Sequence, residues 1–397
     1  MWADRHVVVG VTGGIASYKA CHLVRRLSEA GARVDVVLTR GAAEFIRPIT
    51  FEALSGRPVL SSLWEPDRAL AHVRLGQEAD LIVVAPATAH LIARVANGLA
   101  DDFLTAMLLA RSKPTLLAPA MNDEMYAAEA TQANLGKLRA RGTAIVGPEI
   151  GPLAEGASDR PGRMSEPETI LRYAERLLRS SARWQGTRVV VTAGPTRESL
   201  DPVRVLTNRS SGKMGFRLAE AAWTRGADVL LITGPTSELA PVGVTIERIE
   251  STAELAAAVG RALPNADLLI MAAAPADYAP AVPLDRKRPR IDGPLALTLE
   301  ATPDVLTATK QARKRGSLVV GFALETGDAV AKGAAKLARK ELDFIVVNDA
   351  LEAGAGFEVS TNRVTILDSA GGRVDLPLAD KAAIAEGILD RVEGRLG

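Results

Sequence analysis

Short sequence words that occur twice, in the same order, limit most strongly how this chain can fold. Each word is a run of four to six β-branched or aliphatic residues that ends in Gly, Pro, Ala or Thr. Continuous apolar runs without alternation are typical of parallel strands that helices cover on both faces. The pairs are HVVVGVTGG at residue 6 with RVVVTAGPT at 188, AGARVDVVLTRG at 30 with RGADVLLITGPT at 225, ADLIVVAPATA at 79 with ADLLIMAAAPAD at 266 and, more loosely, PTLLAPAMN at 114 with SLVVGFALET at 317.

Helical patterns separate these words. Residues 17–30 place apolar side chains on one face and end before Gly31, and residues 214–225 do the same before Gly226. Glycine is favoured just after a helix because it adopts the left-handed conformation there. Strands that alternate with helices predict an α/β fold, and the repeat predicts two doubly wound, Rossmann-like parallel sheets in tandem.

The length of the chain agrees with two domains. At ~100–200 residues per domain, 397 residues suffice for two or three, and each half has enough strands for one sheet. A closing helix is followed by a short polar linker near residues 180–186. We therefore expect domains at residues 1–183 and 184–397.

Composition excludes several classes of protein. Lys and Arg number 48 against 47 Asp and Glu, so no overall field favours nucleic acid or an acidic membrane. The longest uncharged stretch, residues 81–93, is shorter than the ~20 residues of a membrane-spanning helix. Cys21 is the single cysteine, which rules out an internal disulfide framework and fits a reducing cytoplasm.

Turns at the carboxyl ends of the first-half strands are the expected ligand site. Residues 11–15, VTGGI, lead from a strand into a helix, where backbone N–H groups and the helix dipole suit a phosphate. The G-x-G-x-x-G fingerprint is absent, so a mononucleotide phosphate is favoured over a dinucleotide. A tight connection without a ligand is the alternative.

Polar residues at the other first-half turns have ordinary explanations as well. Thr39 and the PATA segment at residues 86–89 suit either a ligand or helix caps. His72 is either catalytic or a structural histidine in a loop, and Asn122 is either a ligand contact or a turn-capping residue.

The second half carries an unusual loop, residues 201–215, in which Asn208 and Lys213 precede a helix. Its glycines and hydroxyls suggest an anion site, although the spacing is not that of a P-loop. The basic run at residues 286–290 is either a solvated loop or an arm over a polyphosphate. Lys336 and Lys340 are spaced to lie on one helix face, where both ammoniums could reach one phosphate chain.

The whole chain resembles the bacterial bifunctional phosphopantothenoylcysteine decarboxylase/phosphopantothenate–cysteine ligases of coenzyme A biosynthesis. The motifs that carry this resemblance are GVTGGIASYK, LAHVRLGQEAD, APATAHLIARVANGLADD and APAMNDEMY in the first half, and TAGPTRESLDPVRVLTNRSSGKMGF, AAAPADY and GFALET in the second. It implies a flavodoxin-like flavoprotein half followed by a ligase half.

For the first half, the resemblance implies an FMN-dependent decarboxylase that converts 4'-phosphopantothenoylcysteine into 4'-phosphopantetheine. The flavin oxidises the cysteinyl thiol, which creates a sink for the electrons left by carbon dioxide. His72 matches the catalytic histidine and Asn122 the residue that orients the substrate carboxylate. The implied FMN-binding residues are Gly13, Gly14, Ile15, Thr39, Thr88, Ala89, His90, Leu91 and Ala120.

The sequence departs from the family pattern in one place. Where the family's flap has L-A-C-G, this chain has LAEG at residues 153–156, so the expected cysteine is replaced by Glu155. Glu155 or Asp159 is then the candidate proton donor for the final reduction. A ligase with a degenerate flavoprotein half, or a non-catalytic flavin-binding regulatory subunit, are the alternatives.

For the second half, the resemblance implies a CTP-dependent ligase that joins 4'-phosphopantothenate and cysteine through an acyl-cytidylate. Asn208 matches the residue that contacts this intermediate and Lys287 a catalytic lysine, with Mg²⁺ bridging the triphosphate mainly through phosphate oxygens and water. The implied CTP-binding residues are Met271, Ala272, Ala273, Asp277, Lys287, Pro303, Asp304, Val305, Leu306, Phe322, Lys336 and Lys340. The family also implies trimers through the flavin half and dimers through the ligase half, together a dodecamer.

Overall fold

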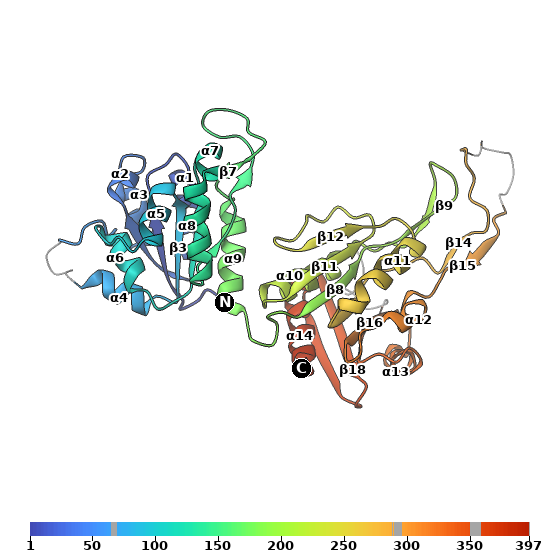
Figure 1. Cartoon of the computed structure of the whole chain (residues 1–397). Helices are drawn as coiled ribbons and strands as arrows, with labels where there is room; N and C mark the ends of the chain where they lie inside the picture. Colours follow the sequence, from blue (N-terminus) through green and yellow to red (C-terminus); the bar gives the residue numbers. More distant parts are fainter. Residues whose placement is uncertain (65–69, 288, 290–295, 350–358, 397) are drawn as a thin grey trace. The chain divides into compact units, whose positions relative to one another are not determined.

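The chain forms two compact units, Met1–Leu178 and Arg179–Gly397 (Figure 1). The structure, a computed structural model, describes residues 1–64, 70–287, 289, 296–349 and 359–396. The segment 350–358 and part of the basic run at 286–290 lie outside the described residues.

The first unit is built on a five-stranded sheet with the order β2-β1-β3-β4-β5. All neighbouring strands are parallel, as the apolar runs predict. The strands are β1 (His6–Val11), β2 (Arg33–Leu38), β3 (Leu81–Ala87), β4 (Thr115–Pro119) and β5 (Ala144–Ile145), and β6 (Glu149–Ile150) pairs separately with β7 (Pro161–Arg163). The helices are α1 (Ser17–Glu29), α2 (Arg40–Ala43), α3 (Pro48–Ser55), α4 (Ala71–Glu78), α5 (Ala89–Ala96), α6 (Phe103–Ala110), α7 (Asp123–Ala127), α8 (Glu129–Ala140) and α9 (Pro167–Arg179).

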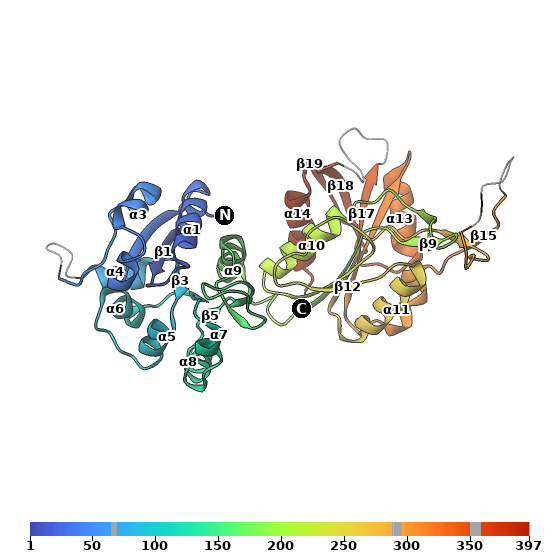
Figure 2. The ribbon, with the colours of Figure 1, turned by 90° about the horizontal axis from the view of Figure 1, so that it is seen from above.

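Helices cover both faces of this sheet. Val7 and Val9 of β1 belong to a core shared with α1, α3 and α9, whereas Val8 belongs to a core shared with α4, α5, α6 and α8. Figure 2 shows α1 and α3 on one side of the strands and α5 and α8 on the other. Successive side chains of a strand point to opposite faces, so a strand covered on both sides is apolar throughout. The doubly wound fold is confirmed.

The second unit is built on an eight-stranded sheet with the order β12-β11-β8-β13-β16-β17-β18-β19. Its strands are β8 (Arg188–Ala193), β11 (Asp228–Thr233), β12 (Thr245–Arg248), β13 (Leu268–Met271), β16 (Leu318–Glu325), β17 (Phe344–Asp349), β18 (Thr361–Asp368) and β19 (Arg373–Asp380). Two short pairs lie outside this sheet: β9 (Arg197–Ser199) with β10 (Val205–Thr207), and β14 (Tyr278–Pro280) with β15 (Leu299–Ala301).

Two groups of helices cover the second sheet. Its helices are α10 (Lys213–Thr224), α11 (Thr252–Ala262), α12 (Val305–Ala308), α13 (Ala329–Arg339) and α14 (Lys381–Glu393), with 3₁₀ turns η1 (Leu263–Asn265) and η2 (Lys310–Ala312). α11, α12 and α13 share one core with the strands. α10 and α14 contact each other and pack against β8 and β18 respectively (Figure 2).

The two sheets repeat one strand order. In the first unit β1, β2, β3 and β4 are arranged as β2-β1-β3-β4, and their counterparts in the sequence repeat are arranged as β11-β8-β13-β16. The tandem repeat is therefore confirmed at the level of topology. The antiparallel strands β18 and β19 are an addition to the predicted parallel sheet. β19 is the edge strand and is mostly exposed, unlike the buried runs, whereas β18 lies between β17 and β19 and is largely buried.

Candidate functional site

A cavity of about 820 Å³ lies at the carboxyl ends of the strands in the first unit. Its walls come from the turns after β1, β2, β3 and β4, which is where open α/β sheets bind ligands. The cavity-lining residues include every residue that the resemblance assigns to FMN, namely Gly13, Gly14, Ile15, Thr39, Thr88, Ala89, His90, Leu91 and Ala120, and also Asn122.

The turn after β1 is shaped to let a ligand approach its backbone. Within the described residues, the N–H groups of Gly13, Gly14 and Ile15 have no hydrogen-bond acceptor. A Cβ on Gly13 would lie only 2.7 Å from the backbone of Gly41. The Ser17 hydroxyl donates to Gly14 O at 2.6 Å and fixes the turn at the start of α1. Unpaired N–H groups at a helix N-terminus suit a phosphate, so the turn fits the phosphate group of FMN.

Three polar residues of this cavity also cap helices. The Thr39 and Thr88 hydroxyls accept from Ala42 N and Leu91 N. The Asn122 side-chain oxygen accepts from Glu124 N at 2.9 Å. The capping that the sequence offered as an alternative is therefore present, and it fixes side chains that line the cavity. Capping occupies the oxygen of Asn122, which directs its amide nitrogen to other partners.

His72 is not among the cavity-lining residues. It lies in α4, not in a loop as the sequence suggested, and its ring meets Phe103 edge-on with centroids 6.1 Å apart. In the described part of the chain, its buried Nδ1 has no hydrogen-bond partner. The cavity of a single copy therefore brings Asn122 to the ligand site without His72.

The segment that resembles the family's flap reaches the cavity. Leu153 and Gly156 pair through their backbones, and Glu155 between them lines the cavity. The Ser158 hydroxyl donates to Asp123 Oδ2 at 2.6 Å, next to Asn122. This hydrogen bond is the leading cause that lowers the pKa of Asp123 below its ordinary value. The flap is thus hydrogen-bonded to the helix that Asn122 caps.

Lys19 is a cavity-lining residue that sequence reasoning missed. Its side chain is buried, and Nζ donates to Met164 O at 3.1 Å and to Glu166 Oε1 at 2.9 Å. Lys19 shares a helix face with Leu23 and Leu27 at spacings of four. A charged residue on an otherwise apolar helix face was therefore the sequence signal that could have identified it.

A second cavity, of about 340 Å³, lies at the carboxyl ends of the strands in the second unit. The Asn208 amide donates to Ala274 O at 3.3 Å and to Pro275 O at 2.9 Å, which fixes the loop before α10 against the turn after β13. The predicted residues that line this cavity are Asn208, Met271, Ala272, Ala273, Asp277, Pro303, Asp304, Val305, Leu306, Phe322, Lys336 and Lys340.

Both predicted lysines of α13 and its C-terminus already have protein partners. Lys340 Nζ lies 2.7 Å from Asp304 Oδ2, and Lys336 Nζ donates to Phe322 O at 2.9 Å. Burial lowers the pKa of Lys336, and the neighbouring Lys340 lowers it further. Burial acts to raise the pKa of Asp304, but the Lys340 hydrogen bond outweighs it and the pKa is lowered. Both ammonium groups line the same cavity, Lys336 bonded to a backbone carbonyl and Lys340 to the Asp304 carboxylate.

Lys287 does not line this cavity. It is exposed in the segment between β14 and β15, and its neighbours Arg288 and Arg290 lie outside the described residues. The cavity-lining residues that sequence reasoning missed include the polar side chains of Asn348, Asn362 and Lys381. Asn348 lies next to the end of the buried strand β17, which was a usable signal, whereas Asn362 and Lys381 belong to segments whose packing the sequence did not predict.

Comparisons with known proteins agree with two enzymatic units. Residues 1–179 match a family model described as Flavoprotein, and residues 184–396 one described as DNA/pantothenate metabolism flavoprotein C-terminal domain. The chain is 41% identical over 399 residues to a coenzyme A biosynthesis bifunctional protein CoaBC of Vibrio vulnificus, which covers 100% of this chain and 99% of that protein. This chain belongs to the CoaBC family. A CoaBC protein of Mycobacterium tuberculosis is 45% identical over 403 residues, which cover 98% of this chain and 96% of that protein.

A crystal structure of the C-terminal domain of a CoaBC protein is 38% identical and covers 54% of this chain and 98% of that chain, with a TM-score of 0.47. As a CoaBC-family member, the chain is a bifunctional enzyme, with a decarboxylase and a ligase. The ligase-only alternative is set aside because the similarity extends over both halves. Among the described residues, no helix has the length and apolarity to cross a lipid bilayer.

Proposed function

We propose that residues 184–397 of this CoaBC-family chain join 4'-phosphopantothenate to cysteine with CTP, and that residues 1–183 then decarboxylate the product with FMN. The observation that supports this assignment is that each unit holds its own cavity at the carboxyl ends of its own sheet. The first cavity collects the residues expected to bind FMN. The second collects those expected to bind CTP, except Lys287.

The ligase reaction needs an activated carboxylate, because a carboxylate is a poor electrophile. A carboxylate oxygen of 4'-phosphopantothenate attacks the α-phosphorus of CTP and pyrophosphate leaves. The cysteine amine then attacks the acyl carbon and CMP leaves. Asn208 contacts the acyl-cytidylate, and Lys336 and Lys340 hold the phosphates by charge-assisted hydrogen bonds.

Magnesium in this scheme binds to the triphosphate more than to the protein. Among the described residues, no group of three or more His, Cys, Asp or Glu side chains is placed to hold a metal ion. Mg²⁺ keeps several waters and commonly bridges phosphate oxygens, so a dedicated protein site is not required. Lys287 does not line the cavity, and its assignment to the nucleotide rests on the family resemblance.

In the first unit the protein binds and orients the groups that react. The backbone N–H groups after β1 hold the flavin phosphate, and Thr39 and Thr88 line the cofactor's cavity. Bound FMN would supply the two-electron oxidation of the cysteinyl thiol and, after carbon dioxide has left, the two-electron reduction of the product. The amide nitrogen of Asn122 orients the substrate carboxylate without a full charge that would oppose its loss.

Glu155 is our candidate for the proton donor in the last reduction. It replaces the cysteine expected from the family pattern and lines the cavity from the flap. A carboxylic acid can donate a proton at that position as a thiol would. Glu155→Gln should slow only the reduction, so that the unsaturated product accumulates in mass spectra while carbon dioxide is still released.

His72 acts from a second copy of the chain in this proposal. It does not line the cavity of its own copy, yet the resemblance assigns it to catalysis and implies trimers through this half. In a symmetric trimer, each copy supplies its histidine to one neighbour. The site is then complete only in the oligomer.

The two halves of the proposal are tested separately. Purified protein should show a flavin absorption spectrum, and 4'-phosphopantothenate with CTP should release pyrophosphate before cysteine is added. A colourless protein would contradict the first half, and a nucleotide-independent reaction would contradict the second.

A further inference from the structure

A buried glutamate of the second unit lies behind the turn that forms one wall of its cavity. Glu198 of β9 is 7% exposed, and it does not line the cavity. Its Oε1 accepts from Thr252 N at 2.9 Å and from the Thr252 hydroxyl at 2.8 Å. Thr252 is the first residue of α11, so the carboxylate lies at the positive end of a helix dipole. A buried carboxylate is costly unless such donors bind it.

Two buried threonine hydroxyls connect this carboxylate to the backbone of the cavity wall. The Thr196 hydroxyl lies 2.9 Å from the Thr252 hydroxyl, and it accepts from Ala276 N at 2.9 Å. Each hydroxyl has one proton, and a carboxylate oxygen can only accept. Thr252 therefore donates to Glu198, and Thr196 donates to Thr252. The hydrogen bonds run in one direction, from the amide of Ala276 to the carboxylate.

The turn at residues 274–277, which these hydrogen bonds reach, lines the cavity. Ala276 is 4% exposed, and its carbonyl accepts from the Thr302 hydroxyl at 2.6 Å. The next residue is Asp277, which is exposed at the cavity and which we have assigned to CTP. The carbonyls of the two residues before Ala276 accept from the Asn208 amide. A shift of Ala276 would therefore move both Asp277 and Asn208.

The order of these hydrogen bonds depends on an acceptor at position 198. Without it, Thr252 N would be left unpaired in the core. The Thr252 hydroxyl lies 3.4 Å from Ala276 O, so it would turn toward the groups that hold Ala276. Buried polar groups without partners are costly, so the surrounding backbone would move to satisfy them.

We propose that Glu198 is a positioning residue for nucleotide binding. Through the two threonine hydroxyls it fixes the turn at residues 274–277, and through that turn it fixes Asp277 and Asn208. This inference rests on the ligase function proposed above and adds a residue that lies outside the cavity. Glu198 does not touch the nucleotide in this proposal, so its effect on CTP is transmitted entirely through the turn.

Calorimetry with the full-length chain and CTP tests this role without turnover. Glu198→Ala removes the acceptor and should bind CTP about tenfold more weakly than the wild-type protein. Glu198→Gln should bind CTP within about twofold of the wild-type protein, because its side-chain oxygen can still accept both Thr252 hydrogen bonds. Thr196→Val nearly keeps the shape of the side chain but leaves Ala276 N unpaired, so it should also weaken CTP binding about tenfold.

Glu250→Ala is the matched control. Glu250 is an exposed glutamate two residues before Thr252, and its Oε1 lies 3.7 Å from Arg197 Nη1 in an exposed pair. This variant should bind CTP as the wild-type protein does. Denaturant unfolding shows the conditions under which each variant is folded, and the affinities are compared there.

Three results would overturn the inference. In the first, folded Glu198→Ala and Thr196→Val bind CTP as tightly as the wild-type protein, as a purely structural role would predict. If Glu198→Ala does not fold, Thr196→Val alone decides this point. In the second, Glu198→Gln binds CTP as weakly as Glu198→Ala. In the third, the wild-type protein does not bind CTP, which would contradict the ligase function as well.

Discussion

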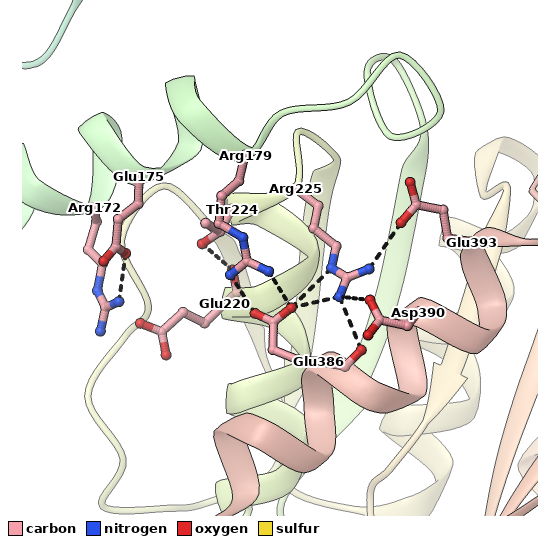
Figure 3. A network of polar contacts seen from close by, with 9 residues as sticks. All are labelled: Arg172, Glu175, Arg179, Glu220, Thr224, Arg225, Glu386, Asp390 and Glu393. Atoms are coloured by element: carbon pink, nitrogen blue, oxygen red, sulfur yellow. Dashed lines mark hydrogen bonds and ion pairs between the residues drawn. The ribbon is translucent and has the colours of Figure 1, made fainter. Parts of the chain in front are cut away.

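Arg225 Nη2 donates to Glu386 Oε2 at 2.6 Å, and this ion pair joins the end of α10 to the second turn of α14 (Figure 3). The Arg225 side chain is 7% exposed, and its guanidinium lies 5.9 Å from the ring centroid of the buried Trp184. Arg179 adds a second guanidinium to Glu386. A buried cation with carboxylates around it is costly to break, although it adds little over a well-packed apolar core.

Replacing Arg225 should destabilise the second unit. Arg225→Gln removes the buried cation that Glu386 and Glu393 share, while Arg179 stays on Glu386, so we expect the free energy of unfolding to fall by about 3 kcal/mol. Denaturant unfolding followed by tryptophan fluorescence measures this change. Arg373→Gln is the control, because Arg373 and Asp375 form an exposed pair whose loss should cost less than about 1 kcal/mol. Equal losses in both variants would contradict a special role for Arg225.

The same network predicts how stability depends on pH. Burial acts to raise the pKa of Glu386, but hydrogen bonds from Arg179 and Arg225 outweigh it, so its pKa lies below the ordinary 4.5. A carboxyl with a lowered folded-state pKa stabilises the fold above its unfolded pKa, and that stability is lost as the pH falls through the folded pKa. The free energy of unfolding should therefore decrease below pH 4.5, and less steeply in Glu386→Gln. If Glu386→Gln kept the wild-type pH dependence of the free energy of unfolding, Glu386 would not be a cause of the loss of stability below pH 4.5.

The flavin turn should not tolerate a side chain at Gly13. A Cβ there would lie 2.7 Å from the Gly41 backbone, so Gly13→Ala must shift the turn that we assign to the flavin phosphate. We expect flavin affinity to fall about tenfold, as for other overpacked sites. Fluorescence titration of the apoprotein with FMN measures it. Gly136→Ala is the control, because nothing lies within 4 Å of a Cβ at that position of α8, and it should bind flavin normally. If Gly13→Ala bound FMN as tightly as the wild-type protein, the flavin phosphate would not lie at this turn.

Mixing two inactive variants tests whether His72 acts between copies. A copy with His72→Asn cannot supply the histidine to the site of its neighbour. A copy with Asn122→Ala lacks the substrate contact in its own cavity. Co-expressed in equal amounts, they should regain about a quarter of the wild-type rate of carbon dioxide release, because a quarter of sites in a random trimer combine both native residues. Mixtures as inactive as their parents would show that both residues serve the same copy.

The sequence predicted much of the fold because apolar runs and helix ends are local features. The repeated words of β1 and β8 predicted two sheets, and the structure adds that both have the same strand order. The turn after β1 and the loop before α10 were both predicted to bind anions, and each lines a cavity. Lys381 and Asn362 were missed because they meet the cavity only through the packing of α14 and β18, which no local pattern specifies. His72 was placed in a loop because a lone histidine carries no periodic signal. Lys287 was predicted at the nucleotide site, a role that still awaits a test.

One incubation tests most directly whether the two units act in sequence. Full-length protein with 4'-phosphopantothenate, cysteine and CTP is followed by mass spectrometry over time. We predict that 4'-phosphopantothenoylcysteine forms first and is then consumed, with 4'-phosphopantetheine and carbon dioxide as the final products. Accumulation of 4'-phosphopantothenoylcysteine without any carbon dioxide would contradict two successive reactions on one chain.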